Sequence, residues 1–262
     1  MLGSSLSVIL ICQVTLGVLM VDQYIYKDLI HLLQLRASEL LLLMVAGLDI
    51  CKATLDQLDK KLTNSKGKFW SLAVDITNES EVVDGFEWIK EHLGPVHILV
   101  NCAGIARDND LIDGDAQMWK DVLDTNVFGL CLATREAVKH MTSNEIKGHV
   151  IHINSISGHT VLPYSRTNVY CASKYAVTAL TETLRREIVL KGLGIKVTSI
   201  SPGLVSTNLY ESAGFHPKAI KAIGNRPSLY PKDIADGVLY VLGTPPHVQV
   251  HELTIKPVGE ID

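Results

Sequence analysis

The stretch from residue 150 to residue 200 decides the fold. It contains Val150–Ile153 (VIHI), then Asn168–Leu190 (NVYCASKYAVTALTETLRREIVL), then Ile195–Ile200 (IKVTSI). The two short runs predict buried strands, and the long segment between them predicts a helix. Strands joined through a helix pair in parallel, and a parallel sheet needs cover on both of its faces. This unit therefore predicts an α/β fold.

The same alternation continues on both sides of this unit. Further strands are predicted at Leu6–Leu10, Leu40–Leu48, Phe69–Val74, Val96–Val100 and Leu253–Ile255, and further helices at Thr54–Lys61, after Asn78, at Gln117–Met141 and at Lys232–Leu242. Asn78 with Glu81 three residues later is typical of a capping box. We interpret residues 1–262 as a single doubly wound domain with a mainly parallel sheet.

The composition excludes several classes of function. The chain has 262 residues, 47% of them hydrophobic, and a formal net charge of −4, so we expect no nucleic-acid partner. Its five cysteines form no CxxC pair and its ten histidines no HExxH, so we expect no metal site.

Polar residues follow several of the predicted strands. Asp75, Asn101, Ser155 and the segment Ser201-Pro202-Gly203 each stand where a strand ends. In an open parallel sheet, ligands bind beyond the carboxyl ends of the strands. We therefore expect these residues to meet in one crevice.

The sequence Tyr170-Cys171-Ala172-Ser173-Lys174 carries the sharpest chemical signal. Residues four apart lie on one face of a helix, so Lys174 stands beside Tyr170. An ammonium group favours the phenolate, and we expect it to lower the pKa of Tyr170 from its usual value of about 10. A hydroxyl at Ser155 could then bind the oxygen of a carbonyl or alcohol that exchanges a proton with Tyr170.

Five ordered motifs resemble the short-chain dehydrogenase/reductase family. They are VDITN at Asp75, NCAG at Asn101–Gly104, Asn126-Val127, Ser155 with YCASK, and SPGLVST at residues 201–207. The stretch INSISGHTVLPYSRTNVYCASK and the ending HELTIKPVGE resemble its farnesol-dehydrogenase-like and dehydrogenase/reductase member 11 branches. The resemblance implies a Rossmann-type domain that binds NAD(P)(H) and an oligomer, a dimer or tetramer, formed through the two long helices.

The resemblance also implies roles for individual residues. The catalytic set is Asn126, Ser155, Tyr170 and Lys174, with Tyr170 as general acid in reduction and general base in oxidation. Asn126 would hold a water molecule in the proton relay. The substrate would be a lipophilic alcohol or carbonyl compound, such as an isoprenoid alcohol (farnesol) or a steroid ketone. Its predicted contacts are Ser155, Leu162, Tyr164 and Tyr170, and the segment 209–227 would help to line the pocket.

Residues 1–52 depart from the family pattern. Members begin with a strand followed by TGxxxGxG, whose glycines let the backbone approach the pyrophosphate. Here CQVTLGVL, residues 12–19, stands at that place and keeps only Gly17. The next strand ends in Asp49, where related proteins carry an arginine for the 2′-phosphate of NADP. An acidic residue there favours NAD, unless the divergence of this region leaves Asp49 without a role.

The predicted cofactor contacts combine the family motifs with these divergent positions. They are Gly17, Asp49, Asp75, Ile76, Asn101, Ala103, Gly104, Tyr170, Lys174, Pro202, Gly203, Val205 and Thr207.

The uncharged run Leu6–Val21 has two interpretations. Extended to Met1, it reaches the roughly 20 residues that a membrane anchor needs. If it left for a membrane, however, too few residues would remain for the first strand, its loop and the first helix. We therefore expect Leu6–Leu10 to be the first strand and the protein to be cytoplasmic, with the anchor as the alternative.

Three hypotheses about function remain open. The first is a working oxidoreductase, favoured by the complete set Asn126, Ser155, Tyr170 and Lys174. The second is a non-catalytic family member, because the glycine-rich loop is lost. The third is a truncated or mis-spliced enzyme whose first 52 residues replace a normal start. For the chain as it stands, the lost phosphate contacts and the added bulk predict impaired dinucleotide binding.

Overall fold

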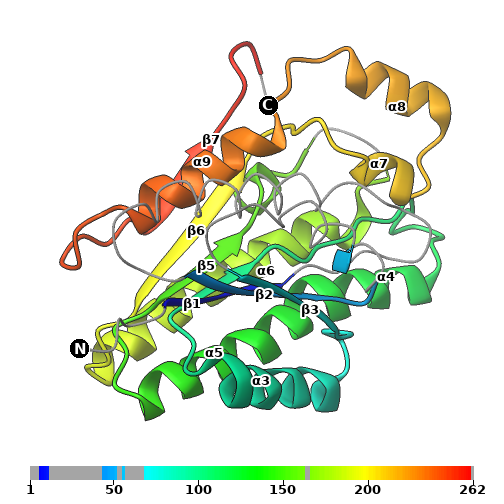
Figure 1. Cartoon of the computed structure of the whole chain (residues 1–262). Helices are drawn as coiled ribbons and strands as arrows, with labels where there is room; N and C mark the ends of the chain where they lie inside the picture. Colours follow the sequence, from blue (N-terminus) through cyan, green and yellow to red (C-terminus); the bar gives the residue numbers. More distant parts are fainter. Residues whose placement is uncertain (1–5, 12–42, 52–54, 57–67, 163–165, 261–262) are drawn as a thin grey trace.

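A parallel sheet forms the centre of the molecule (Figure 1). The computed structural model describes residues 6–11, 43–51, 55–56, 68–162 and 166–260. Within them the sheet has seven strands in the order β3-β2-β1-β4-β5-β6-β7. The strands are β1 (Leu6–Ile11), β2 (Leu43–Asp49), β3 (Lys68–Ala73), β4 (Ile98–Asn101), β5 (His149–Ile153), β6 (Lys196–Pro202) and β7 (Glu252–Ile255).

The first strand lies inside this sheet. In β1, Val8 pairs in parallel with Val45 of β2 on one side and with Ile98 of β4 on the other. The prediction of a strand at Leu6–Leu10 is confirmed, with one further residue. Among the helices of the described residues, none has the length and apolar content needed to cross a bilayer.

Helices cover both faces of the sheet, as continuously apolar strands require. On one face, α9 (Pro231–Leu242) packs its buried residues Ile234 and Val238 against strand residues such as Val100 and Ile200. On the other face lie α3 (Glu79–Leu93), α5 (Leu130–Ser143) and α6 (Asn168–Leu190), and Figure 1 shows α3 and α5 below the sheet. The other helices of the described residues include α4 (Ala116–Leu123), α7 (Leu209–Ser212), α8 (Pro217–Gly224) and a 3₁₀ turn at Ile156–Gly158. The predicted α/β fold is confirmed.

The start of α3 agrees with the sequence only in part. The Asn78 side chain accepts a hydrogen bond from the backbone N–H of Ser80, at 3.1 Å, so Asn78 is the N-cap as predicted. The reciprocal bond of a capping box would run from the backbone N–H of Asn78 to Glu81. Glu81 instead accepts from the backbone N–H of Asp75, at 2.8 Å, and from the Asn78 side-chain amide. The carboxylate thus ties the helix start to the end of the preceding strand.

The long helix predicted at Gln117–Met141 is not continuous. Between α4 and α5, residues Asp124–Gly129 form a π-helical segment. Gly129 lies so close to Ile76 that a Cβ atom there would stand 2.8 Å from the Ile76 side chain. Such segments recur at functional sites, and this one contains Asn126.

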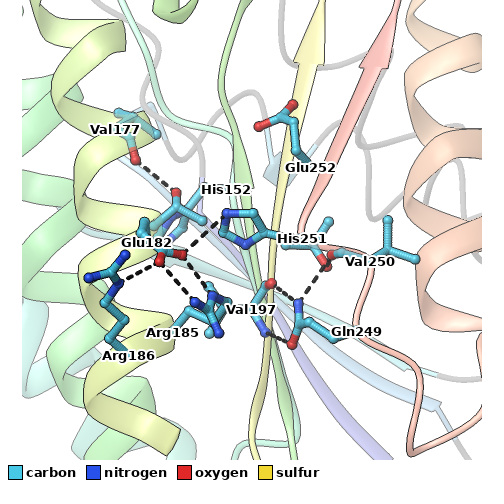
Figure 2. A network of polar contacts seen from close by, with 12 residues as sticks. His152, Val177, Glu182, Arg185, Arg186, Val197, Gln249, Val250, His251 and Glu252 are labelled. Carbon is cyan, nitrogen blue, oxygen red and sulfur yellow. Dashed lines mark hydrogen bonds and ion pairs between the residues drawn. The ribbon is translucent and has the colours of Figure 1, made fainter.

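A network of polar contacts fastens β7 to α6 (Figure 2). The Nε2 atom of His251, directly before β7, lies 3.4 Å from the Glu182 carboxylate of α6. Hydrogen bonds from Arg185 and Arg186 lower the pKa of Glu182 to about 2, so this carboxylate stays charged. Gln249 accepts a hydrogen bond from the backbone N–H of Val197, at 3.3 Å. These contacts tie the residues before β7 to α6 and to β6.

Two glycines give a matched test of the packing. A Cβ at Gly148, just before β5, would stand 2.6 Å from the backbone oxygen of His97 and 2.6 Å from Met141 Sδ. We expect Gly148→Ala to lower the free energy of unfolding by about 2 kcal/mol, within the range of overpacking effects. Gly224→Ala, with nothing within 4 Å of the new Cβ, should leave it unchanged or slightly raised. Urea unfolding measures both, and equal stability of the two variants would contradict the packing described.

Candidate active site

A cavity of about 150 Å³ lies beyond the carboxyl ends of β4, β5 and β6. It brings together many of the residues predicted from sequence: Gly104, Ser155, Leu162, Tyr170, Lys174, Pro202, Gly203, Val205 and Thr207. Leu209, Tyr210, Phe215 and Arg226 also line it, as predicted for the segment 209–227.

Tyr170, Lys174 and Ser155 form the centre of this cavity. Tyr170 and Lys174 lie one turn apart near the start of α6, and Lys174 Nζ is 5.9 Å from the centre of the Tyr170 ring. Lys174 is buried and donates a hydrogen bond of 3.2 Å to the backbone oxygen of Ile153, at the end of β5. The Ser155 side chain is hydrogen-bonded to Tyr170 and also accepts from the backbone N–H of Ser157, at 3.1 Å. The hydroxyl groups of Ser155 and Tyr170 therefore lie together near the buried ammonium of Lys174.

The pKa of Tyr170 is shifted in the direction opposite to the one expected. Burial raises it above the ordinary value for tyrosine, and the nearby Tyr210 raises it further. The hydrogen bond with Ser155 lowers the pKa, but by less than burial raises it. The sequence indicated the neighbouring ammonium and not the desolvation of the phenol. Tyr170 is therefore a neutral phenol near neutral pH, the form that donates a proton.

Asn126 joins the loop after β4 to the helix that carries Tyr170. Its Oδ1 accepts from the backbone N–H of Ile105 at 2.8 Å, and its Nδ2 donates to the backbone oxygen of Ile105 at 2.9 Å and to Ser173 Oγ at 3.0 Å. Ser173 Oγ in turn donates to the backbone oxygen of Tyr170, at 2.7 Å. Because both Nδ2 protons are engaged, a water molecule held here would have to donate to Oδ1. The role in a proton relay stays a prediction.

Asn101 begins a chain of buried polar side chains beneath the site. Its Nδ2 donates to Thr134 Oγ1 at 3.0 Å, which lies 3.3 Å from His152 Nε2. His152 Nδ1 is 2.9 Å from Thr181 Oγ1 of α6. Burial lowers the pKa of His152 to about 4, so the ring is neutral. Among the described residues, the buried Oδ1 of Asn101 has no hydrogen-bond partner.

The predicted contacts at the adenine end lie near their expected strands. Asp49 ends β2, is buried, and accepts a hydrogen bond of 2.7 Å from the backbone N–H of Cys51. Asp75 accepts from both the backbone N–H and the hydroxyl of Thr77. Ile76 and Ala103 are buried. Gly17, with the rest of residues 12–19, and Tyr164 lie outside the described residues.

Arg166 and Asn168, which the sequence analysis did not single out, hold the segment before α6 at the cavity. Arg166 pairs with Asp108 and with Asp110, the latter at 3.0 Å, and joins the segment before α6 to the loop after β4. Asn168 donates to the backbone oxygen of Arg107, at 2.8 Å. Both Arg166 and Asn168 have positive φ, at 68° and 35°. Such strained residues persist only where surrounding contacts hold them, and these two lie immediately before Tyr170.

Glu260 is a further cavity residue that the sequence analysis did not predict. It lines the cavity from the far end of the chain, and its side chain is 5% exposed. Its distance from the motifs in sequence hid it, since no spacing rule connects residue 260 with residue 203.

The nicotinamide end of a dinucleotide fits this cavity. The buried ammonium of Lys174 and the hydroxyls of Ser155 and Tyr170 supply hydrogen-bond donors and acceptors for ribose hydroxyls and an amide. Pro202 and Gly203 form the opposite wall. These residues would hold that end of the cofactor.

The chain is similar in sequence to several known proteins. The family model for short chain dehydrogenases matches residues 41–216. The farnesol dehydrogenase of Aedes aegypti is 45% identical over 220 residues, which cover 83% of this chain and 87% of that protein. The human dehydrogenase/reductase SDR family member 11 is 40% identical over 190 residues, 71% of this chain and 73% of that protein.

Solved structures share the fold. A short-chain type dehydrogenase/reductase from Mycobacterium marinum has a TM-score of 0.80 at 24% identity, over 97% of this chain and 95% of that chain. The closed form of serine dehydrogenase complexed with NADP+ has a TM-score of 0.79 at 25% identity, over 97% of this chain and 96% of that chain.

The neutral histidines of β5 predict a pH dependence of stability. Burial lowers the pKa of His149 to about 3 and that of His152 to about 4. Below pH 6.5 the unfolded chain binds protons that the folded chain does not, so stability is full above pH 6.5 and falls as the pH drops toward 4. We expect His149→Gln to reduce the slope of the free energy of unfolding against pH by about 1.4 kcal/mol per pH unit. Urea unfolding between pH 4 and pH 7 measures it.

The exposed His247 provides the control. His247→Gln should leave the slope unchanged. An unchanged slope in His149→Gln would show that His149 titrates alike in the folded and unfolded chain.

Proposed function

Because this chain belongs to the short-chain dehydrogenase family and is therefore an oxidoreductase, we propose that it interconverts a lipophilic alcohol and the corresponding carbonyl compound by hydride transfer with a nicotinamide dinucleotide. The observation that carries this proposal is the hydrogen-bonded pair of Ser155 and Tyr170 beside the buried Lys174, all facing one cavity.

The proton chemistry belongs to Tyr170. In reduction its phenol donates a proton to the carbonyl oxygen, and in oxidation its phenolate takes the proton from the alcohol. The bound dinucleotide supplies the hydride to the carbonyl carbon, or accepts it from the alcohol carbon. Ser155 donates a hydrogen bond to the substrate oxygen and so aligns it with Tyr170.

Lys174 and Asn126 assist this proton transfer in two different ways. The Lys174 ammonium, 5.9 Å from the centre of the Tyr170 ring, stabilises negative charge as it develops on the phenol. Asn126 fixes the turn of α6 that carries Tyr170, through Ser173. Tyr170 can therefore react without reorganising the helix.

Three apolar side chains around the cavity, Leu162, Leu209 and Phe215, support a lipophilic substrate. The volume of about 150 Å³ is below the roughly 300–1,000 Å³ of pockets that enclose drug-sized ligands. We infer that the reacting carbon and its neighbours enter the cavity, while the rest of an isoprenoid chain lies along the segment 209–227. The name of the Aedes aegypti relative is in keeping with such a substrate.

The first test is turnover. The purified full chain should oxidise farnesol with NAD+ or NADP+, followed by absorbance at 340 nm. Tyr170→Phe should lower the rate by about a thousandfold or more, because the proton acceptor is removed, with an unchanged melting temperature. Tyr240→Phe, at an exposed tyrosine of α9, is the matched control and should keep the full rate. Full turnover by Tyr170→Phe would refute the mechanism.

A non-catalytic relative is the second candidate function. One observation favours it: the family model begins to match at residue 41, after the segment whose glycine pattern is lost. This alternative, and that of a truncated or mis-spliced enzyme, require weak binding of the dinucleotide. Micromolar binding of NADH or NADPH would exclude both.

Asp49 supports a preference for NAD over NADP. Its carboxylate ends β2, where it would accept hydrogen bonds from ribose hydroxyls and repel a 2′-phosphate. We expect NADH to bind about tenfold or more tighter than NADPH in fluorescence titrations, and Asp49→Ser to remove this difference. Asp84→Asn, at an exposed position of α3, should leave it intact. Tighter binding of NADPH by the unaltered chain would contradict the role of Asp49.

We further propose a homo-oligomer, a dimer or tetramer, that works in the cytoplasm. A groove of about 530 Å³ between α5 and α6, with Leu130, Val138, Leu180 and Leu184 among its lining residues, supports assembly through these helices.

A further inference from the structure

The chain turns back sharply after β7. The backbone N–H of Glu260 donates to the carbonyl of Pro257, at 3.2 Å, and Gly259 has a φ of 91°, which closes a tight turn. Val258 at the tip is 99% exposed, whereas the side chain of Glu260 is 5% exposed. The turn therefore directs one carboxylate from the end of the chain into the molecule.

Glu260 reaches the wall of the cavity formed by the segment after β6. Its Oε1 accepts a hydrogen bond of 2.9 Å from the backbone N–H of Leu204. Its Oε2 lies against Gly203, where a Cβ atom would come within 2.2 Å of it. This close approach gives a physical reason for glycine at position 203.

The second oxygen of this carboxylate is buried and accepts no hydrogen bond from the described residues. Lys256 Nζ forms an ion pair with Oε2 at 3.7 Å. A buried carboxylate oxygen costs free energy unless an ion pair or a bound molecule compensates it. Glu260 lines the same cavity as Tyr170 and Lys174.

The wall that Glu260 contacts is held rigidly. The carbonyl of Leu204 accepts from the backbone N–H of Leu229, and that of Leu229 accepts from Ser206, both at 2.8 Å. Gly203 donates to the carbonyl of Ile255, at 2.7 Å. With Oε1 bound to this fixed backbone, the position of Oε2 is fixed as well.

We propose that Glu260 is a positioning residue for the nicotinamide end of the cofactor. Its Oε1 fixes the Gly203–Leu204 wall, and its Oε2 accepts a hydrogen bond from the carboxamide N–H₂. This inference rests on the proposed function. The carboxamide N–H₂ is a hydrogen-bond donor that a carboxylate oxygen can accept from, and the loss of NADH binding without loss of ADP-ribose binding distinguishes it from an alcohol or ribose hydroxyl.

The substitution Glu260→Gln distinguishes the role of Oε1 from that of Oε2. A glutamine keeps an oxygen for the backbone N–H of Leu204 but places an N–H₂ group where Oε2 was, and this opposes the N–H₂ of the carboxamide. We expect NADH to bind about tenfold or more weaker, as for a lost hydrogen bond to a charged group. ADP-ribose, which has the same adenine end and no nicotinamide, should bind as it does to the unaltered chain.

The experiment measures NADH binding by fluorescence and ADP-ribose binding by calorimetry, on the full chain and two variants. Glu91→Gln, an exposed position of α3, is the matched control and should not affect either ligand. The melting temperature of Glu260→Gln should match that of the unaltered chain, and Glu260→Ala should weaken NADH at least as much.

Each contrary result has a distinct meaning. If the unaltered chain binds both ligands and Glu260→Gln binds NADH equally well, the role of Glu260 is refuted and the proposed function stands. Equal weakening of NADH and ADP-ribose would also refute it, because the effect would not belong to the nicotinamide end. Absence of binding of both ligands by the unaltered chain would overturn the proposed function and this inference together.

Discussion

The pairing of β1 with β2 on one side and β4 on the other is the constraint on which the rest of the structure depends. The strand order changes direction at this point, so the connections on either side diverge and leave a crevice beyond the strand ends. Asn101 ends β4, and Ser155 follows β5, the next strand in the sheet. Without β1, the inner edges of β2 and β4 would each lose their hydrogen-bonding partner.

The site adds polar groups that are stable only because the surrounding backbone satisfies them. Lys174 donates to Ile153, Asn126 bonds both backbone groups of Ile105, and Glu260 accepts from Leu204. Buried polar groups cost free energy unless such partners are present. The backbone therefore fixes each side chain in one orientation, and little reorganisation remains when a ligand enters.

The predicted element bounds agree well with the structure where periodicity carried the signal. The helix at Asn168–Leu190 has the bounds predicted, and each strand of the sheet lies within a few residues of its prediction. The predictions that failed involve contacts between distant segments. The π-helical segment lies where Gly129 approaches Ile76, and Glu81 bonds the backbone of Asp75, just after the preceding strand. The pKa of Tyr170 rises because side chains from several elements bury the phenol.

The sequence by itself determined the fold class, the strand that starts the sheet, and the residues Ser155, Tyr170 and Lys174. It could do so because local periodicity and residue spacing specify strands, helices and one helix face. Only the tertiary structure decided how these groups are bonded, how burial sets the protonation of Tyr170, and that Glu260 belongs to the same cavity. Those properties depend on desolvation and on contacts between residues far apart in the chain, which no local pattern records.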